Sequence, residues 1–261
     1  MNEEKIVFIG GGAAGATAAL ETRKRLRDAE ITILESGAYP QYSCCALPFV
    51  LGGEIDDYRD IILFDEGFYK EFGKMDLLLN TKALAIDRDS KKVICEGREF
   101  EYDKLVITTG SYAFVPPISG LDKISFGKRT FLYKFMPEAK ALHDAAAGAR
   151  RALVIGAGLV GMEVADALNR RGVEVTMIEL LPTIMHVMVD DDMARMVTGH
   201  FEENGIKMFL GTKVTGISES QDLVSVATDE GEHAADLCIL ASGVRAETGI
   251  ARDAGLEVGR G

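Results

Sequence analysis

The sequence predicts an α/β protein with two parallel central sheets, because one strand–glycine loop–helix–strand–acid unit occurs in it twice. The first copy begins EKIVFIGGGAAGATAALETRKRL and ends AEITILES; the second reads RALVIGAGLVGMEVADALNRRGVEVTMIEL. In each copy a β-branched run enters a GxGxxG turn, a helical stretch follows, and a second apolar run ends in Glu35 or Glu179. Strands that alternate with helices in this way are typical of a doubly wound parallel sheet.

The glycine spacing indicates that both units bind dinucleotides. From Gly15 to Glu35 the chain advances 20 positions, and from Gly161 to Glu179 it advances 18. Both spacings are close to the one that brings an acid to a ribose 2′-hydroxyl. The alternative is that both loops are merely glycine turns in a doubly wound sheet, but it does not explain why an acid follows each loop at this distance. We therefore expect two Rossmann-like dinucleotide-binding domains, each three layers deep, with parallel central sheets and small antiparallel β-meanders.

The residues around each glycine turn are the candidate cofactor ligands. The first glycine permits the tight turn, the second lets the backbone approach a pyrophosphate, and the third lets the helix pack on the strand. The helix N-terminus then offers N–H groups and the positive end of its dipole to the phosphates. The candidates are Gly10, Gly12, Ala13, Ala14, Gly15, Glu35 and Ser36 in the first unit, and Gly156, Gly158, Leu159, Val160, Gly161 and Glu179 in the second. Because Leu180 and Leu181 follow Glu179, with no arginine to neutralise a 2′-phosphate, the second site favours NADH over NADPH.

The segments between and after the two units repeat as well. Short strands with turns fill residues 75–110, and they close on KLVITTG, which supplies Thr109 and Gly110 as further cofactor candidates. The Pro-rich stretch AFVPPISGLD is the best linker. Helical periodicity resumes at 136–149 and again at 191–204, and a second set of short strands ends in LCILASG, with Gly243 as a candidate. We divide the chain into a first nucleotide domain at 1–112, a second at 113–243, and a return segment at 244–261.

Composition narrows the possible partners. The 261 residues carry a net charge of −12, which repels nucleic acid and anionic membranes. No apolar run is long enough to span a bilayer, and the first strand begins near Lys5, so we expect a cytoplasmic protein without a signal peptide. The 4 cysteines, two of them adjacent, do not form a disulfide framework. We expect no bound metal.

The adjacent cysteines carry the densest chemistry between the two units. Cys45 precedes Ala46-Leu47-Pro48-Phe49, where Pro48 suits the first turn of a helix. A thiol at a helix N-terminus has its thiolate stabilised by the dipole, which raises its nucleophilicity at neutral pH. The alternative is that Cys44 and Cys45 are small buried residues. From the residues alone the two interpretations are about equal.

With these residues in place, the chain resembles the pyridine nucleotide-disulfide oxidoreductases, in their single-cysteine branch of coenzyme A-disulfide reductases, NADH oxidases and NADH peroxidases. The matching pieces run in family order: GGGAAG with Glu35, then CALPF with Cys45, then YDKLVITTGS, then GAGLVGME with Glu179, then LCILASGVR. The resemblance implies FAD at the first loop, NADH at the second, and a redox-active Cys45. It also places Glu163 near the nicotinamide; the alternative is an ordinary glutamate on a helix surface.

Departures from the family pattern limit what the resemblance implies. Five residues before Cys45 stands Pro40, which excludes the CxxxxC mechanism with two thiols. Gln41-Tyr42-Ser43-Cys44 replaces the Ser-Phe-x-Asn of coenzyme A-disulfide reductases, so Ser43 and Cys44 are weaker substrate candidates, and Cys44 is better explained as a bystander than as a resolving thiol. The family's GYxG tyrosine is Leu159 here. Arg23 stands where an arginine contacts coenzyme A phosphates in relatives; the alternative is a solvated helix face.

The resemblance leaves the reaction open. The leading hypothesis is a flavin-dependent NADH:disulfide or persulfide reductase that acts on small-molecule thiols of the coenzyme A type. Its rivals are an NADH oxidase or peroxidase that uses a Cys45 sulfenic acid, a ferredoxin-reductase-like carrier, and a nucleotide-binding fragment with little activity. Family members continue beyond this length, so we expect the flavin site to be incomplete and the intact enzyme to be a homodimer through a C-terminal domain.

Overall fold

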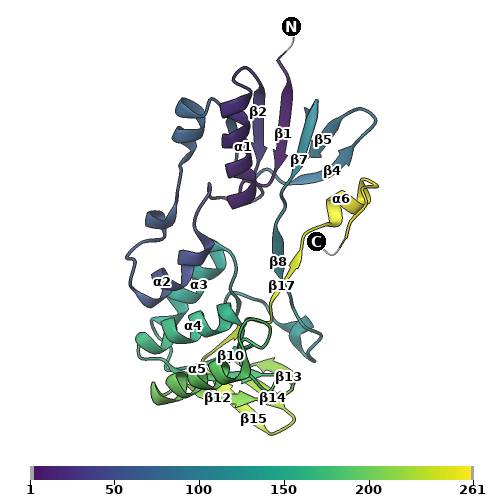
Figure 1. Ribbon diagram of the computed structural model, residues 1–261. Coiled ribbons are helices and arrows are strands. Elements are labelled where there is room, and N and C mark those ends of the chain that lie inside the picture. The colour runs from purple at the N-terminus through teal and green to yellow at the C-terminus, as the bar shows by residue number, and fades with distance from the viewer. Residues whose placement is uncertain (1–2, 260–261) are drawn as a thin grey trace. The chain divides into compact units, whose positions relative to one another are not determined.

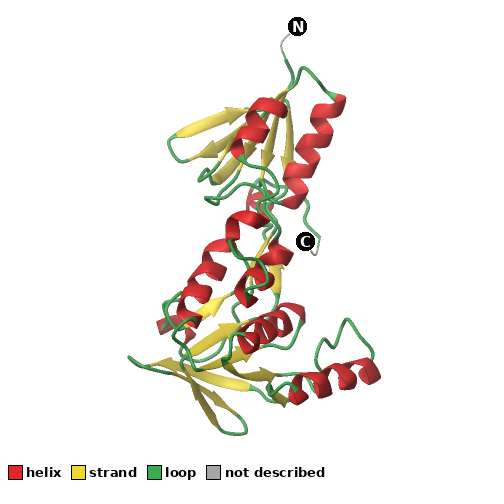
Figure 2. Ribbon diagram, turned by 90° about the vertical axis from the view of Figure 1, so that its left-hand side faces the viewer, coloured by secondary structure: helices red, strands yellow, loops and turns green. Residues whose placement is uncertain are grey.

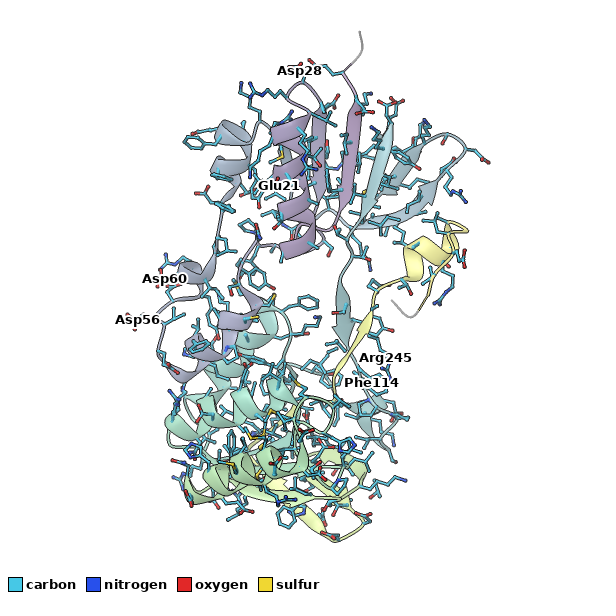
Figure 3. All side chains as sticks on the ribbon, viewed as in Figure 1. Glu21, Asp28, Asp56, Asp60, Phe114 and Arg245 are labelled. Carbon is cyan, nitrogen blue, oxygen red and sulfur yellow. The ribbon has the colours of Figure 1, made fainter. Side chains whose placement is uncertain are left out.

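The computed structural model describes residues 3–259, which form two units (Figure 1). Unit 1 comprises the described residues up to Ser43, Arg59–Tyr112, and those from Arg245 on. Unit 2 comprises Cys44–Tyr58 and Ala113–Val244. The chain enters unit 2 through β8 (Ser111–Ala113) and leaves it through β17 (Val244–Ala246), and these two strands pair. Figure 3 labels Arg245 on β17 and Phe114 directly after β8.

Unit 1 is built on a parallel sheet with the strand order β3-β2-β1-β7. These strands are β1 (Lys5–Ile9), β2 (Glu30–Leu34), β3 (Asp76–Leu78) and β7 (Lys104–Ile107). Helix α1 (Ala13–Arg25) joins β1 to β2. The antiparallel meander comprises β4 (Ala83–Asp87), β5 (Lys92–Cys95) and β6 (Arg98–Glu101), and α6 (Gly249–Asp253) follows β17.

The two faces of this sheet carry different layers, because side chains alternate along a strand. Ile6 and Phe8 of β1 pack with Ala16 and Ala19 of α1. Val7 and Ile9 point the other way and pack with the meander, where the cluster includes Val93 and Cys95. Figure 2 shows the helix and the meander on opposite sides of the strands. Unit 1 therefore has the three layers that the sequence predicts.

Unit 2 repeats this plan around a parallel sheet of order β12-β11-β10-β16-β9. Its strands are β9 (Thr130–Leu132), β10 (Arg151–Ile155), β11 (Glu174–Glu179), β12 (Lys207–Leu210) and β16 (Leu237–Leu240). Its helices are α2 (Leu47–Gly52), α3 (Met136–Ala146), α4 (Leu159–Arg170) and α5 (Asp191–Glu203). The meander comprises β13 (Val214–Glu219), β14 (Val224–Thr228) and β15 (Glu232–Ala235). The expected α/β architecture with two Rossmann-like units is confirmed.

One segment lies in a different unit from its sequence neighbours. Residues 44–58 fall within the first range that the sequence indicates, 1–112, but they pack in unit 2. The reason is burial: Leu47, Val50 and Leu51 of α2 are at most 2% exposed. A Cβ built on Gly52 would lie 3.5 Å from the Cα of Ala167 on α4. This is ordinary van der Waals distance, so α2 packs directly against α4 at this point.

No helix in residues 3–259 is both long enough and apolar enough to cross a lipid bilayer. The same described residues hold no cluster of three or more His, Cys, Asp or Glu side chains that would suit a metal ion.

Candidate functional site: two glycine loops and a cysteine turn

The first glycine loop connects β1 to α1 in a conformation that only glycines permit. Gly10 has φ of +107°, and a Cβ there would lie 2.2 Å from the carbonyl oxygen of Thr108. A Cβ on Gly15 would lie 1.9 Å from the carbonyl oxygen of Gly10. At Gly12, by contrast, a Cβ would meet nothing within 4 Å. The first and third glycines are therefore required by the fold, while the second faces open space.

Glu35 closes this loop from the end of β2. One carboxylate oxygen accepts a hydrogen bond from the N–H of Gly11 at 2.7 Å, and the other accepts one from the N–H of Gly37 at 2.6 Å. The hydroxyl of Ser36 lies 3.4 Å from the second oxygen. A carboxylate has about four acceptor positions, so these bonds leave capacity for a ribose hydroxyl. Glu35 thus both shapes the loop and presents an acceptor beside it.

The second glycine loop repeats this geometry. Gly156 also has φ of +107°, and a Cβ there would lie 2.5 Å from the carbonyl oxygen of Ala241. A Cβ on Gly161 would lie 2.0 Å from the carbonyl oxygen of Gly156, and one on Gly158 would meet nothing within 4 Å. The two loops are therefore local copies of each other, as their sequences predict.

Glu179 holds the second loop as Glu35 holds the first. Its carboxylate accepts hydrogen bonds from the N–H of Ala157 at 2.6 Å and the N–H of Leu181 at 2.8 Å. Leu180, which follows it, is 62% exposed and offers no positive charge to a 2′-phosphate.

Both loops fit a dinucleotide by the chemistry they present. Neither α1 nor α4 has a side-chain cap or an acid in its first turn, so their N-terminal N–H groups remain available to phosphate oxygens. The candidates that follow the second glycine are exposed: Ala13 and Ala14 in unit 1, Leu159 and Val160 in unit 2. Open space at the second glycine, uncapped N–H groups and a carboxylate acceptor are the three features that a dinucleotide requires.

Thr109, Gly110 and Gly243 lie where the chain crosses between the units. The Thr109 hydroxyl donates to the carbonyl oxygen of Glu247, and the N–H of Glu247 donates to the carbonyl oxygen of Gly110. The carbonyl oxygen of Gly243 accepts a hydrogen bond from the N–H of Phe114 at 2.9 Å. In this structure these three candidates hold the crossing strands; their contact with a cofactor stays a prediction.

Thr108, which sequence reasoning missed, touches the first glycine loop directly. Its hydroxyl lies 3.0 Å from the carbonyl oxygen of Ile9 and 3.1 Å from that of Gly10, and it donates toward both. A Cβ on Gly15 would lie 2.6 Å from this hydroxyl oxygen. The motif KLVITTG contains the residue, but only the pairing of β7 with β1 shows that the first threonine reaches the loop.

The cysteine turn belongs to unit 2. Cys44 and Cys45 lie in a 3₁₀ turn that precedes α2, with Pro48 in the first turn of that helix, and both are exposed. The interpretation of the pair as small buried residues is therefore wrong. The other two cysteines contrast with them: Cys95 and Cys238 are buried, and burial raises the pKa of both thiols. Exposure thus leaves Cys44 and Cys45 as the candidates for thiol chemistry.

Ser43, the other substrate candidate at this turn, lies in unit 1, where its N–H donates to the carbonyl oxygen of Ile61 at 2.9 Å.

Arg23 is engaged by the backbone. Its Nε donates to the carbonyl oxygen of Gly73 at 3.0 Å, its Nη1 to those of Leu26 and Arg27, and its Nη2 to that of Lys74 at 2.7 Å. Four of the five N–H donors of the guanidinium are used in this way. The side chain therefore caps the C-terminal end of α1 and ties it to a later segment. A guanidinium bonded in this way is not free to bind a phosphate.

Glu163 lies in the second turn of α4 and is half-buried. Burial raises the pKa of its carboxyl group. Its position near a nicotinamide stays a prediction.

Residues 4–261 match the family described as pyridine nucleotide-disulphide oxidoreductase. An NADH oxidase from Methanocaldococcus jannaschii is 33% identical over 263 residues, which cover 98% of this chain and 58% of the oxidase.

Solved structures that are similar in sequence and fold include two with names that describe a reaction. The NAD-dependent persulfide reductase from A. fulgidus is 34% identical with a TM-score of 0.92, over 98% of this chain and 49% of that chain. The water-forming NADH oxidase from Lactobacillus brevis, bound to NADH, is 30% identical with a TM-score of 0.89, over 96% and 56%. The chain thus spans about half the length of these relatives. By the match over nearly its whole length, the chain belongs to the pyridine nucleotide-disulphide oxidoreductase family.

Proposed function

We propose that the protein is a flavin-dependent oxidoreductase that passes hydride from NADH through FAD to a sulfur acceptor linked to Cys45. The observation that carries the proposal is the pair of glycine loops, each closed by a carboxylate, at the N-termini of α1 and α4. Family membership implies FAD and NAD(P)H as the two cofactors. The persulfide reductase from A. fulgidus supports a sulfur acceptor.

The first loop is the proposed FAD site. The N–H groups at the start of α1 bind pyrophosphate oxygens, and Glu35 accepts a hydrogen bond from a ribose hydroxyl while it keeps its bond to the Gly11 N–H. FAD, when bound, supplies the two-electron relay between NADH and sulfur. The proposed ligands are Gly10, Gly12, Ala13, Ala14, Gly15, Glu35, Ser36, Thr109, Gly110 and Gly243.

The second loop is the proposed NADH site. Glu179 holds the adenosine ribose, and the start of α4 holds the pyrophosphate. Positions 180 and 181 are leucines, so no basic side chain follows Glu179 to neutralise a 2′-phosphate, and this favours NADH over NADPH. The proposed ligands are Gly156, Gly158, Leu159, Val160, Gly161, Glu163 and Glu179.

Cys45 is the proposed catalytic nucleophile. Its thiolate attacks one sulfur of a disulfide R–S–S–R, forms a Cys45–S–S–R bond and releases R–S⁻. Two electrons from NADH then break the mixed disulfide and release the second thiolate. Overall, NADH, one proton and R–S–S–R give NAD⁺ and two R–SH. With a persulfide R–S–SH, the products are NAD⁺, R–SH and H₂S.

The second candidate function is an NADH oxidase or peroxidase, which the M. jannaschii and L. brevis relatives favour. In the peroxidase reaction the Cys45 thiolate attacks one oxygen of a peroxide and becomes a sulfenic acid, and the other oxygen leaves as hydroxide or alkoxide. NADH then reduces the sulfenic acid to the thiol and water. Both candidates use the same cysteine and the same electron donor.

Three further proposals follow from the length of the relatives and from composition. The ranges 1–112, 113–243 and 244–261 correspond to an FAD domain, an NADH domain and a return to the FAD domain. The intact enzyme is a homodimer, and it acts in the cytoplasm. Size measurement in solution tests the oligomer.

The deciding experiment compares Cys45→Ser with Cys44→Ser as its matched control. We would first record the flavin absorbance of each purified protein, then mix with NADH, and then with coenzyme A disulfide, a persulfide or hydrogen peroxide in a stopped-flow instrument. We expect Cys45→Ser to lower turnover by at least about 100-fold, because the attacking atom is lost, and Cys44→Ser to stay within about threefold of the parent chain.

The acceptor that reoxidises the parent protein separates the two functions. Fast reaction with disulfide or persulfide supports the reductase, and fast reaction with peroxide supports the peroxidase. Full activity of Cys45→Ser with all acceptors would contradict both and would favour a ferredoxin-reductase-like carrier. A colourless protein that lacks flavin absorbance would instead favour a nucleotide-binding fragment.

A further inference from the structure

The peptide between Gly10 and Gly11 in the first glycine loop is held at both of its polar groups. Its carbonyl oxygen accepts a hydrogen bond from the Thr108 hydroxyl at 3.1 Å, and its N–H donates to Oε2 of Glu35 at 2.7 Å. The hydroxyl also lies 3.0 Å from the carbonyl oxygen of Ile9, but that oxygen already accepts from the N–H of Thr108 at 2.8 Å. Thr108 and Glu35 therefore hold the two ends of one peptide group.

The second loop holds the matching peptide, Gly156–Ala157, without such a hydroxyl. The N–H of Ala157 donates to Glu179 at 2.6 Å, as in the first loop. Ala241 follows β16 where Thr108 follows β7, and in each loop the carbonyl oxygen of this residue lies nearest to a Cβ built on the first glycine. The side chain of Ala241 is a methyl group, which has no donor. The two loops therefore differ in how the carbonyl end of the peptide is held.

The first loop needs this extra bond because its peptide lies between two glycines. Glycine adopts positive and negative φ about equally well, so such a peptide rotates more readily than one with a Cβ beside it. Ala157 supplies that Cβ in the second loop, where it is fully buried. In the first loop the same position is Gly11, and a Cβ there would lie 3.1 Å from the Cβ of Glu35, which is tighter than ordinary contact. Thr108 thus restricts a peptide that its own residues leave free.

Rotation of this peptide would disturb Glu35. A rotated peptide turns the Gly10 carbonyl oxygen toward the carboxylate in place of the Gly11 N–H, and an ionised carboxylate only accepts hydrogen bonds. Glu35 then loses the donor that fixes its orientation. The Thr108 hydroxyl opposes the rotation, because the Gly10 carbonyl would have to give up its own bond.

We infer that Thr108 is a positioning residue for FAD: its hydroxyl fixes the Gly10–Gly11 peptide and thereby holds Glu35 ready to accept the 2′-hydroxyl of the adenosine ribose. The inference rests on the proposed binding of FAD at the first glycine loop. The second loop restrains its peptide with the Cβ of Ala157, so the two dinucleotide sites depend on different residues for the same purpose.

The test compares two flavins that differ in one hydroxyl group. FAD and its analogue with 2′-deoxyadenosine are titrated into the flavin-free chain, and the change in flavin fluorescence gives the affinity of each. In the parent chain FAD should bind more tightly than the analogue, because Glu35 accepts from the 2′-hydroxyl. We expect Thr108→Ala to weaken FAD about three- to tenfold, the effect of one hydrogen bond, and to leave the analogue within about twofold.

Two further variants separate the hydroxyl from general loosening of the unit. Thr108→Ser keeps the O–H group and should restore both the FAD affinity and the preference for FAD over the analogue. Thr22→Ala is the matched control: it removes a half-buried hydroxyl that donates to the carbonyl oxygen of Ala18 at 2.8 Å near the C-terminal end of α1. It should leave both flavin affinities unchanged.

The possible outcomes separate the inference from the proposed function. An equal loss for FAD and the analogue in Thr108→Ala, no loss for either, or no restored preference in Thr108→Ser would overturn the inference, as would the same selective loss in Thr22→Ala. Equal affinity of the parent chain for both flavins would overturn it too and leave the proposed FAD site standing. Failure of the parent chain to bind FAD would overturn that site itself, and the inference with it.

Discussion

The two glycine loops have nearly the same geometry, whereas the sheets that carry them differ. Gly10 and Gly156 share φ of +107°, and each loop is closed by a glutamate at 2.6–2.7 Å from a backbone nitrogen. The parallel sheet of unit 1, however, ends at β7 in the described chain, while that of unit 2 continues from β16 to β9. The motif residues and one carbonyl beyond the neighbouring strand, that of Thr108 or Ala241, thus set the same loop geometry in sheets of different extent.

The shared loop geometry and the different sheets lead to different expectations for substitutions. Substitutions in a loop should affect the nucleotide of that loop alone, because the two loops lie in different units. Features that depend on neighbouring strands, such as the hydroxyl of Thr108 after β7, should have no counterpart in unit 2, where Ala241 follows β16.

The largest effect is expected where a Cβ meets backbone. Gly161→Ala places a Cβ 2.0 Å from the carbonyl oxygen of Gly156, so α4 must move away from β10. We expect NADH affinity to fall by at least about 100-fold, the result of severe overpacking. Gly15→Ala, at 1.9 Å from the Gly10 carbonyl oxygen, should lower flavin content and leave NADH affinity unchanged. Calorimetry measures the NADH affinity, and absorbance measures the flavin content. A loss of NADH binding in Gly15→Ala would show that the units are coupled.

Next in size is the carboxylate that closes the second loop. Glu179→Leu removes the acceptor of the Ala157 and Leu181 N–H groups and the proposed ribose acceptor together. Loss of bonds to a charged group predicts NADH affinity about 10- to 100-fold weaker. Glu35→Leu is the matched control and should act on flavin content alone. Equal NADH affinity in Glu179→Leu and the parent would contradict the proposal that Glu179 binds the ribose.

A smaller effect is expected at the open glycines. A Cβ on Gly158 meets no protein atom within 4 Å, so Gly158→Ala should leave the Tm unchanged. The same Cβ lies in the space that the pyrophosphate needs, so NADH affinity should fall about tenfold. Gly12→Ala should do the same for flavin. A drop in Tm with unchanged affinity would mean that the second glycine serves the fold and not the ligand.

The sequence predicts the loops well because most of their constraints lie within the motif; the contact with Thr108 is the exception. Three glycines, an acid about 20 positions on and two apolar strands are enough to indicate the turn, the helix and the closing carboxylate. That Glu35 binds the loop's own N–H group was not predicted, since the spacing alone suggests only a ribose.

What the sequence misses depends on packing between distant segments. Arg23 meets carbonyl groups 50 and 51 positions away, so its role cannot be found from a basic cluster on a helix. The packing of residues 44–58 in unit 2 depends on α2 meeting α4. The bond from Thr108 to Gly10 likewise joins residues 98 positions apart.

The smallest effect concerns the aspartates that directly precede β7 and β16. Asp236 accepts hydrogen bonds from the N–H groups of Arg150 and Arg151 at 2.8 and 2.9 Å, whereas Asp103 accepts one from the N–H of Lys5 at 2.8 Å. Asp236→Asn should lower the free energy of unfolding by about 1 kcal/mol, since solvent screens this partly exposed group, and Asp103→Asn by less. Urea unfolding at pH 7 measures both.

The pH dependence of this effect has a definite sign. Desolvation opposes the charged form of Asp236, but the Arg150 and Arg151 N–H groups and nearby arginine charges outweigh it, so the pKa of this carboxyl is lowered in the folded protein. A carboxyl with a lowered folded pKa stabilises the fold above its unfolded pKa, about 3.9, and loses that contribution as pH falls through the folded value. The difference between the parent and Asp236→Asn should therefore be full at pH 7 and shrink below about pH 4. A difference that stays constant down to pH 3 would mean that the charge of Asp236 contributes nothing and that the asparagine merely packs less well.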